Sequence, residues 1–109
     1  MEEETLSVLV EFSMFPTDVG ESKSQYVSKI IDMLDKEGIN YKLTAMSTIF
    51  EVDSMEKAAE ILTKAYKQLE PYSNRVYSVA KFDIRKGKKD RLTGKIKSVE
   101  EKLGREVKK

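Results

Sequence analysis

The chain has 109 residues, with 20 Lys plus Arg against 19 Asp plus Glu, so its formal net charge of +1 does not favour a generic polyanion partner. It contains no cysteine and no histidine, which excludes disulfides, thiolate nucleophiles, imidazole bases and the common zinc sites. The length predicts a single domain over residues 1–109, and the acidic start without a long apolar run predicts a cytoplasmic protein that does not associate with membranes.

The first predicted strand runs from Leu6 to Met14, and a helix follows it. In the strand, apolar residues recur at every second position, as expected for one buried face: Leu6, Val8, Val10, Phe12 and Met14. Ser22 and Gln25 have the spacing of a capping box, which predicts that the helix begins near them. Its apolar residues repeat at helical spacing: Val27, Ile30, Ile31 and Leu34. Gly38 is expected to end this helix.

The segment from Tyr41 to Glu51 reads as two short strands around a tight turn, and it is unusually polar for a strand pair. Hydroxyls and one carboxylate gather near the bend: Thr44, Ser47, Thr48 and Glu51. This composition points to a small polar ligand, although a hairpin that satisfies its own polar groups would look similar.

A second helix is predicted after the hairpin, with Asp53 and Glu56 as its N-terminal box. Its expected buried stripe consists of Met55, Ala59, Leu62, Tyr66 and Leu69, and Pro71 ends it. From Arg75 to Arg85 the sequence returns to the period of a strand. A charged loop from Lys86 to Arg91 then leads to a short third helix, carrying Ile96, Val99 and Leu103, that Gly104 is expected to terminate.

This order of elements, βαββαβ plus a terminal helix, predicts an α+β ferredoxin-like sandwich with a four-stranded antiparallel sheet. Two helices cover one face of the sheet, and the other face stays open. We expect the first and last strands to be neighbours at the sheet centre. The residues expected on the open face are Glu11, Ser13, Thr44, Thr48, Phe50, Lys81, Asp83 and Arg85, with the hairpin burying Leu43 and Ile49 instead.

The polar open face has two interpretations, and spacing alone slightly favours a solvated surface over a ligand cleft. The same face also carries Leu9, Tyr77 and Val79, which favours an interface between subunits. The basic run from Arg85 to Arg91 is interpreted as a solvated loop in preference to a phosphate site. The expected face has too few aromatics for an RNA-recognition module, so no nucleic acid is expected.

An enzymatic function is a weaker hypothesis than the binding of a small ligand or a structural or regulatory module that assembles through the open sheet face. It would need a carboxylate acting as acid or base beside Lys81, and no nucleophile with an orienting partner can be identified. The sequence therefore predicts a protein that is not an enzyme and that uses neither metal nor cofactor.

Four motifs occur together in order along the chain. They are Glu11-Phe12-Ser13, Tyr41-x-Leu43-Thr44-x-Met46-x-Thr48-Ile49-x-Glu51, Lys81-x-Asp83 with Arg85, and Gly94-Lys95-x-Lys97-Ser98-Val99-Glu100. With these motifs the chain resembles the thiamine-binding-protein family of small ferredoxin-like proteins. Two departures concern the turn, where Ala45 and Ser47 stand in place of the family's usual Pro and Gly, and a third is Ile84, which replaces a frequent acid.

The resemblance implies a homo-oligomer, commonly a tetramer made from dimers, that binds thiamine or its hydroxymethylpyrimidine part without known catalysis. The residues that match the family's binding motif are Ser13, Thr44, Met46, Thr48 and Glu51, with Glu11 and Asp83 as additions. In such a site a carboxylate pairs with the aminopyrimidine or balances the thiazolium charge, hydroxyls satisfy ring nitrogens, and the methionine contacts a ring. The function expected from the resemblance is that of a carrier, buffer or sensor.

Overall fold

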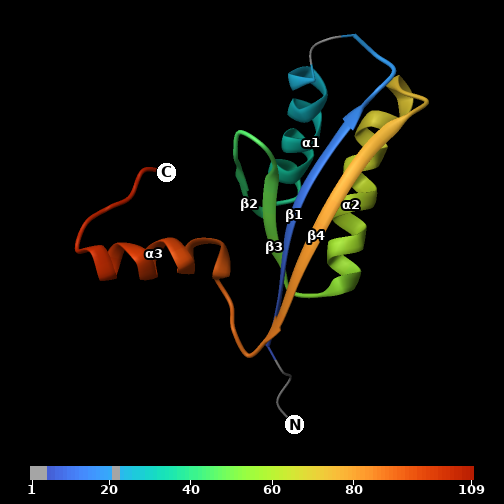
Figure 1. The fold of residues 1–109 in the computed structure, drawn as a ribbon. Coiled ribbons are helices and arrows are strands. Elements are labelled where there is room, and N and C mark those ends of the chain that lie inside the picture. Colours follow the sequence, from blue (N-terminus) through green and yellow to red (C-terminus); the bar gives the residue numbers. More distant parts are fainter. Residues whose placement is uncertain (1–4, 21–22) are drawn as a thin grey trace.

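The computed structural model describes residues 5–20 and 23–109 and confirms the predicted order of elements (Figure 1). The elements are β1 (Leu6–Pro16), α1 (Ser24–Lys36), β2 (Asn40–Leu43), β3 (Thr48–Val52), α2 (Met55–Leu69), a 3₁₀ turn (Glu70–Tyr72), β4 (Val76–Lys86) and α3 (Arg91–Leu103). The capping box predicted at Ser22 lies outside the described residues. Gly38 ends α1 as expected, with a φ of 67° that suits glycine.

The four strands form one antiparallel sheet in the order β2-β3-β1-β4. β1 and β4 are neighbours as predicted, and they pair along the whole length of both strands. The prediction that both lie at the sheet centre was wrong for β4, which forms an edge. The centre is β1 with β3, because β3 pairs with the other side of β1.

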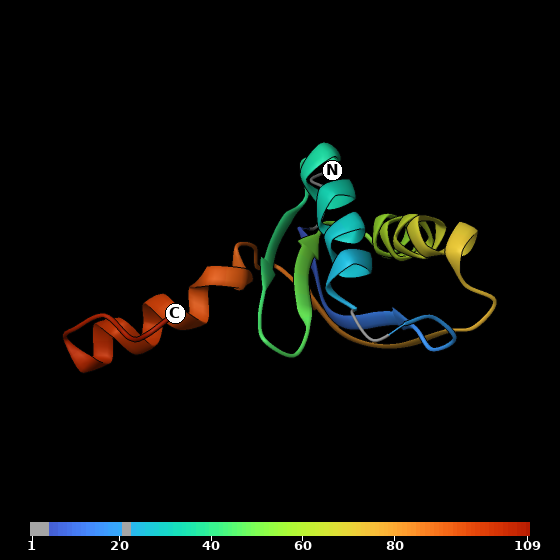
Figure 2. The same cartoon turned by 90° about the horizontal axis from the view of Figure 1, so that it is seen from above.

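Helices α1 and α2 cover one face of the sheet, and the core lies between them and β1 (Figure 2). The alternating residues of β1 supply its floor, including Val8 and Val10, which are fully buried. Phe50 of β3 packs its ring edge-on against Phe12 at a centroid distance of 5.7 Å. The period of two in the first strand therefore predicted the buried face of β1 correctly.

The two faces of β3 were predicted the wrong way round, whereas Leu43 of β2 lies on the helix side as expected, opposite Thr48, but is 56% exposed. Phe50 is directly opposite Val10, and Thr48 is directly opposite Phe12, so both point to the helix side of the sheet. Ile49 pairs with Glu11 and therefore lies on the open face. The reason is that a shift of one residue exchanges the two faces of a strand, and burying the Phe50 ring stabilises this register more than burying Ile49 would.

The start and the buried stripe of α2 also differ from the prediction. The helix is capped by Ser54, whose Oγ accepts a hydrogen bond from the Lys57 N–H at 3.0 Å, and not by Asp53. The buried residues are Ala58, Ile61, Ala65 and Leu69, whereas Met55, Ala59 and Tyr66 are exposed. The two alanines allow α2 to approach the sheet closely, and this favours them over the larger residues that the stripe had assigned to the core.

Helix α3 begins at Arg91 and ends at Gly104, whose φ is 72°, as predicted. It projects away from the two-layer body, so that the C-terminal end of the chain lies apart from the other helices (Figures 1 and 2). Leu92 is the buried residue of α3, while Val99 and Leu103 are 40% and 49% exposed. Within residues 5–20 and 23–109, no helix has the length and apolar character needed to span a bilayer.

Candidate ligand-binding site

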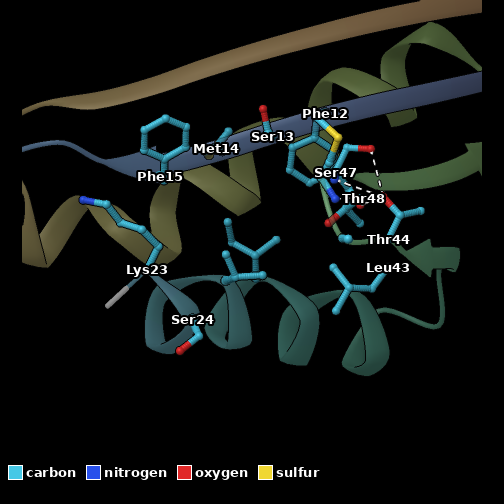
Figure 3. A pocket seen from close by; sticks show the side chains of 14 residues that line it. Phe12, Ser13, Met14, Phe15, Lys23, Ser24, Leu43, Thr44, Ser47 and Thr48 are labelled. Atoms are coloured by element: carbon cyan, nitrogen blue, oxygen red, sulfur yellow. Dashed lines mark hydrogen bonds between the residues drawn. The ribbon is translucent and has the colours of Figure 1, made fainter. Parts of the chain in front are cut away.

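A cavity of about 500 Å³ lies between the end of β1, the first turns of α1 and the β2–β3 turn (Figure 3). Its floor is apolar and includes Phe12, Met14 and Ile30, which are at most 8% exposed. Its polar lining comes mostly from hydroxyls: Ser13, Ser24, Thr44, Ser47 and Thr48. A cavity of this size with an apolar floor and a few polar groups at one end suits a small ring compound.

Lys23 supplies the cation of the cavity, at the end near Phe15. Its Nζ donates a hydrogen bond to the Pro16 carbonyl oxygen at 2.6 Å and lies 5.9 Å from the centroid of the Phe15 ring. These contacts hold the ammonium group at the rim. The hydroxyl-rich end at the hairpin is therefore separated from the positive end by the apolar floor.

The β2–β3 turn is organised by Thr44. Its hydroxyl donates to the Ser47 carbonyl oxygen at 2.9 Å and accepts from the backbone N–H groups of Ser47 and Met46 at 3.1 and 3.3 Å. The Thr44 N–H also donates to the Ser47 carbonyl oxygen at 2.8 Å. Side-chain bonds of this kind replace the stiffness that proline and glycine give to a turn. They account for a tight bend that contains Ala45 and Ser47.

Thr44→Val is therefore expected to lower the free energy of unfolding by about 1 kcal/mol, because it removes the hydroxyl that fixes the turn while keeping the shape of the side chain. Thr44→Ser keeps the hydroxyl and serves as the matched control, with a stability close to that of the parent chain. Urea unfolding followed by far-UV circular dichroism measures both variants. Equal midpoints for the valine and serine variants would contradict this role of Thr44.

A second hollow, of about 320 Å³, lies on the open face of the sheet and meets the cavity at the hairpin. Its lining includes Glu11, Ser13 and Lys81, and it shares Met46 and Ser47 with the cavity. The Ser47 hydroxyl donates to a carboxylate oxygen of Glu11 at 3.0 Å, and Lys81 Nζ lies 4.0 Å from the other carboxylate oxygen. Met46 is 89% exposed at the boundary of the two hollows.

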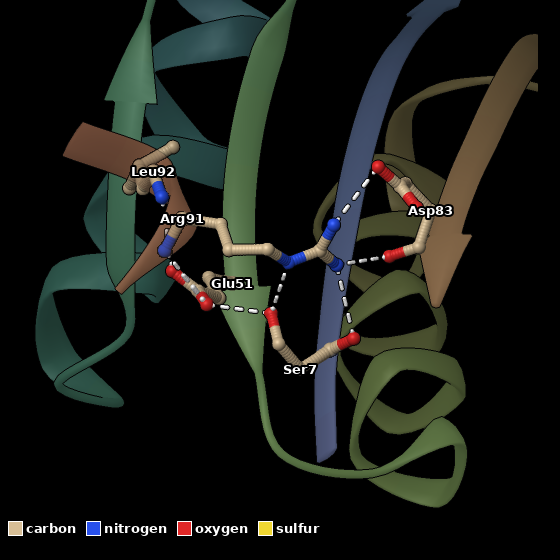
Figure 4. Close-up of polar contacts among 5 residues, drawn as sticks. All are labelled: Ser7, Glu51, Asp83, Arg91 and Leu92. Atoms are coloured by element: carbon tan, nitrogen blue, oxygen red, sulfur yellow. Dashed lines mark hydrogen bonds and ion pairs between the residues drawn. The ribbon is translucent and has the colours of Figure 1, made fainter. Parts of the chain in front are cut away.

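Glu51 lies at the opposite end of β3 from the hairpin turn and anchors α3 (Figure 4). Its carboxylate accepts hydrogen bonds from the Ser7 hydroxyl at 2.6 Å and from the backbone N–H groups of Arg91 and Leu92 at 3.2 and 3.1 Å. A carboxylate at this position satisfies two of the amides that a helix leaves unpaired at its start and interacts favourably with the helix dipole.

Arg91 extends this cluster across the sheet. Its guanidinium donates to the Ser7 hydroxyl at 2.9 Å and the Ser7 carbonyl oxygen at 3.0 Å, and it forms an ion pair with Asp83 at 2.8 Å. The Arg91 side chain is 9% exposed, although the Asp83 side chain is 71% exposed. The desolvated guanidinium therefore spans from β1 to β4 and fixes the start of α3 over the open face.

The environment of Glu51 lowers the pKa of its carboxyl group below the ordinary value of 4.5. Burial alone would raise this pKa, but the Ser7 hydroxyl, the two backbone amides and the Arg91 charge together outweigh it. Glu51 is thus an ionised anchor at neutral pH.

The structure divides the seven predicted site residues into three groups. Ser13, Thr44, Met46 and Thr48 line the cavity, and Glu11 lies in the adjoining hollow. Glu51 and Asp83 belong to the anchor of α3. Glu51 and Asp83 belong to the sequence motifs, but in the structure they lie far from the β2–β3 turn, toward the other end of their strands.

Several lining residues were not predicted. Phe12, Val27 and Ile30 were assigned to the core and Lys23 was assigned no role. Helix α1 brings Val27 and Ile30 to the cavity, and Lys23 immediately precedes this helix. The partners of Glu51, which are Ser7 and Arg91, were not predicted either. These two residues also contact each other, although they are 84 positions apart in sequence. Their residue types alone gave no signal of this contact.

The basic run from Arg85 to Arg91 does not form one loop. Arg85 and Lys86 belong to β4, Gly87 and Asp90 take left-handed backbone conformations, and Arg91 starts α3. The described part of the chain holds no group of three Asp or Glu residues placed to bind a metal ion.

Comparison with known proteins places this architecture in a family. The family described as thiamine-binding protein matches residues 10–100. The UPF0045 protein Mb1933 of Mycobacterium bovis is 33% identical over 98 residues, which is 90% of this chain and 96% of that protein.

Solved structures show the same fold. The hypothetical protein MJ1052 of Methanocaldococcus jannaschii has a TM-score of 0.75 at 30% identity, covering 87% of this chain and 97% of the other. A protein of Thermotoga maritima, described as a candidate thiamine biosynthesis or salvage protein, has a TM-score of 0.67 at 18% identity, covering 85% and 98%. Because the family match spans most of the chain and the sequence identities reach 33%, this chain belongs to the thiamine-binding protein family.

Proposed function

We propose that this chain binds thiamine or its hydroxymethylpyrimidine moiety in the cavity between β1, α1 and the β2–β3 turn, as a carrier, buffer or sensor that does not transform its ligand. The observation that carries this proposal is that Ser13, Thr44, Met46 and Thr48 all line one cavity. The sequence resemblance implies a binding role for those four residues, and the family match over residues 10–100 includes all of them.

The chemistry of the cavity supports an aminopyrimidine ring. Its apolar floor at Phe12 offers a surface for the face of the ring, and hydroxyls can donate to or accept from ring nitrogens and an exocyclic amine. Met46 supplies a polarisable contact. Glu11, in the adjoining hollow, places a negative charge on the side toward which a thiazolium ring would extend.

A function without catalysis is supported by the groups around the cavity. The Glu11 carboxylate in the adjoining hollow accepts a hydrogen bond from the Ser47 hydroxyl of the lining, but the chain has no histidine or cysteine to complete a nucleophile and base pair with it. Lys23 is engaged with the Pro16 carbonyl oxygen, and the Thr44 hydroxyl is engaged with the turn. These contacts favour a role in holding a ligand.

The test is isothermal titration of the purified protein with thiamine, hydroxymethylpyrimidine and thiamine phosphate. Saturable heat with thiamine or hydroxymethylpyrimidine is expected, and no heat with any of the three at millimolar concentration would overturn the proposal. Tighter binding of the phosphate form would indicate that Lys23 or the cations after β4 contact the phosphate group.

We further propose that the chain works as a homo-oligomer, a tetramer built as a dimer of dimers. The supporting observation is the apolar surface left open on the sheet, where Tyr77 and Val79 are 54% and 43% exposed. A second candidate function follows from the same surface, namely an assembly module without a metabolite. In that case Glu11→Gln would change the sedimentation of the protein and leave any heat of thiamine titration unchanged, whereas the binding proposal expects the thiamine affinity to fall.

A further inference from the structure

The longer of the two sheet edges lies along β4, since the other edge strand, β2, has four residues. Two backbone hydrogen bonds mark the ends of the ladder between β4 and β1: Thr17 N–H to the Arg75 carbonyl at 2.9 Å, and Gly87 N–H to the Thr5 carbonyl at 2.7 Å. Because antiparallel ladders alternate, the odd-numbered residues of β4 bond to β1 and the even-numbered residues direct their N–H and C=O groups outward. No other strand among the described residues pairs with that edge.

This edge lacks three of the common devices that keep strands from pairing, namely short length, proline and a bulge, although it carries charged side chains on the open face. β4 is 11 residues long and contains no proline, and its register with β1 runs without a bulge. Phe82 and Ile84 are 42% and 51% exposed on the helix side of the sheet. A further strand laid along this edge would cover part of these two side chains.

We propose that β4 pairs antiparallel with β4 of a second copy of this chain, around a two-fold axis that passes beside Phe82. The two sheets then form one continuous sheet, in which the outward N–H and C=O groups of both edges are satisfied. This proposal specifies an interface for the self-association proposed above, and it does not depend on thiamine binding.

The side chains of β4 select this register. The symmetric registers that keep most of the strand paired centre on Ala80, Lys81 or Phe82. A centre at Lys81 places the two ammonium groups opposite each other, and a centre at Ala80 places Lys81 opposite Val79 and Asp83 opposite Tyr77, so that no charge meets an opposite charge. A centre at Phe82 places Lys81 opposite Asp83 of the partner subunit, twice by symmetry, and opposite charges across strands stabilise a pair.

The other face of the paired strands also matches in this register. The two Phe82 rings lie side by side, and each Ala80 is opposite Ile84 of the partner subunit, so the helix side of the seam is wholly apolar at these positions. Phe82 is an outward-bonding residue, and the axis therefore passes through a hydrogen-bonded pair. The two Lys81–Asp83 pairs and the apolar row therefore meet their complements, while Arg85 lies opposite Val79 of the partner subunit near each end of the seam.

Two cysteine variants test the register in a chain that has no cysteine of its own. Phe82→Cys is expected to form a covalent dimer on mild oxidation, because residues directly opposite in a hydrogen-bonded pair have Cα atoms about 5.5 Å apart, within the range that a disulfide spans. Ile84→Cys is the matched control, since its two copies would lie roughly 13 Å apart along the strands, and it should remain uncrosslinked on a non-reducing gel.

A charge exchange tests the same register without a covalent bond. Lys81→Asp places like charges opposite Asp83 of the partner subunit and is expected to raise the dissociation constant at least about tenfold in sedimentation equilibrium. The double variant Lys81→Asp with Asp83→Lys should associate more tightly than either single variant, and the Asp83→Lys single variant accounts for the lost ion pair between Asp83 and Arg91 of the same chain. A parent chain that stays monomeric up to high micromolar concentration, equal cross-linking of both cysteine variants, or no rescue by the double variant would overturn the proposal. Thiamine titration of the same variants reports separately on the proposed function.

Discussion

Replacing Glu51 by Ala is expected to detach α3 from the sheet and to lower the free energy of its docking by about 2–4 kcal/mol. The carboxylate holds the first two amides of α3 and the Ser7 hydroxyl, and hydrogen bonds to a charged group contribute about 1.5–3 kcal/mol each. Apolar burial cannot replace them, because Leu92 is the buried residue of this helix. Glu51→Ala also leaves the desolvated Arg91 guanidinium with less negative charge around it.

Hydrogen exchange of the amides in residues 91–103 measures this effect directly. Protection in α3 should fall in Glu51→Ala, while α1 and α2 keep most of theirs. Glu101→Ala is the matched control, since Glu101 is an exposed glutamate of the same helix. If α3 in Glu51→Ala were as protected as in the control, the anchor would lie elsewhere.

The same anchor is expected to weaken in acid. The pKa of Glu51 is lower in the folded protein than its ordinary value of 4.5. Its stabilising contribution is therefore complete at pH values above about 4.5 and is lost as the pH falls through the lower, folded pKa. The protection factors of the α3 amides, which correct for the intrinsic pH dependence of exchange, should fall across that interval in the parent chain. Glu51→Gln should show weak protection at all pH values, and an equally steep acid dependence in that variant would assign the titration to another carboxyl group.

Leu43→Trp is expected to lower the affinity for thiamine by about 100-fold or more, or about 2.7 kcal/mol. Leu43 lies at the end of β2, lines the cavity and is 56% exposed, so a larger side chain has room to turn inward without disturbing the core. The indole ring would then occupy the space above Phe12 that the proposed ligand needs. This prediction rests on the proposed function.

Leu103→Trp is the matched control for the cavity variant. Leu103 is a leucine of similar exposure, 49%, on α3, and it does not line the cavity. Both variants should unfold within about 0.5 kcal/mol of the parent chain, as is usual for exposed positions. Isothermal titration then compares their affinities. Thiamine binding by Leu43→Trp that equals binding by Leu103→Trp would show that the ligand lies outside this cavity.

The sequence predicted those parts of the fold in which one strong local pattern decides the structure. The period of two in β1 and the glycines after α1 and α3 were sufficient, because each depends on neighbouring residues alone. The faces of β3 were wrong because this strand is short and carries apolar residues on both sides, Ile49 on one and Phe50 and Val52 on the other. Its register was decided by Phe50 packing against Phe12, which is a tertiary contact.

The part of the candidate site that depends on neighbouring residues could also be predicted from the sequence. Residues around the turn, such as Thr44 and Met46, stay close together in any hairpin, and they line the cavity. Glu51 shares their motif but lies at the far end of β3, where its neighbours come from distant parts of the chain. The distance between Glu51 and the turn residues becomes visible only when the pairing of the strands is known.

The long ladder between β1 and β4 also sets an order of events during synthesis. Contacts between segments far apart in sequence form late, because closing the intervening loop costs entropy. A growing chain can build α1, the hairpin and α2 onto β1 before β4 has left the ribosome. Until then β1 itself has one unpaired edge. The surface most prone to wrong pairing thus lies on β1 in the nascent chain and passes to β4 only when the chain is released.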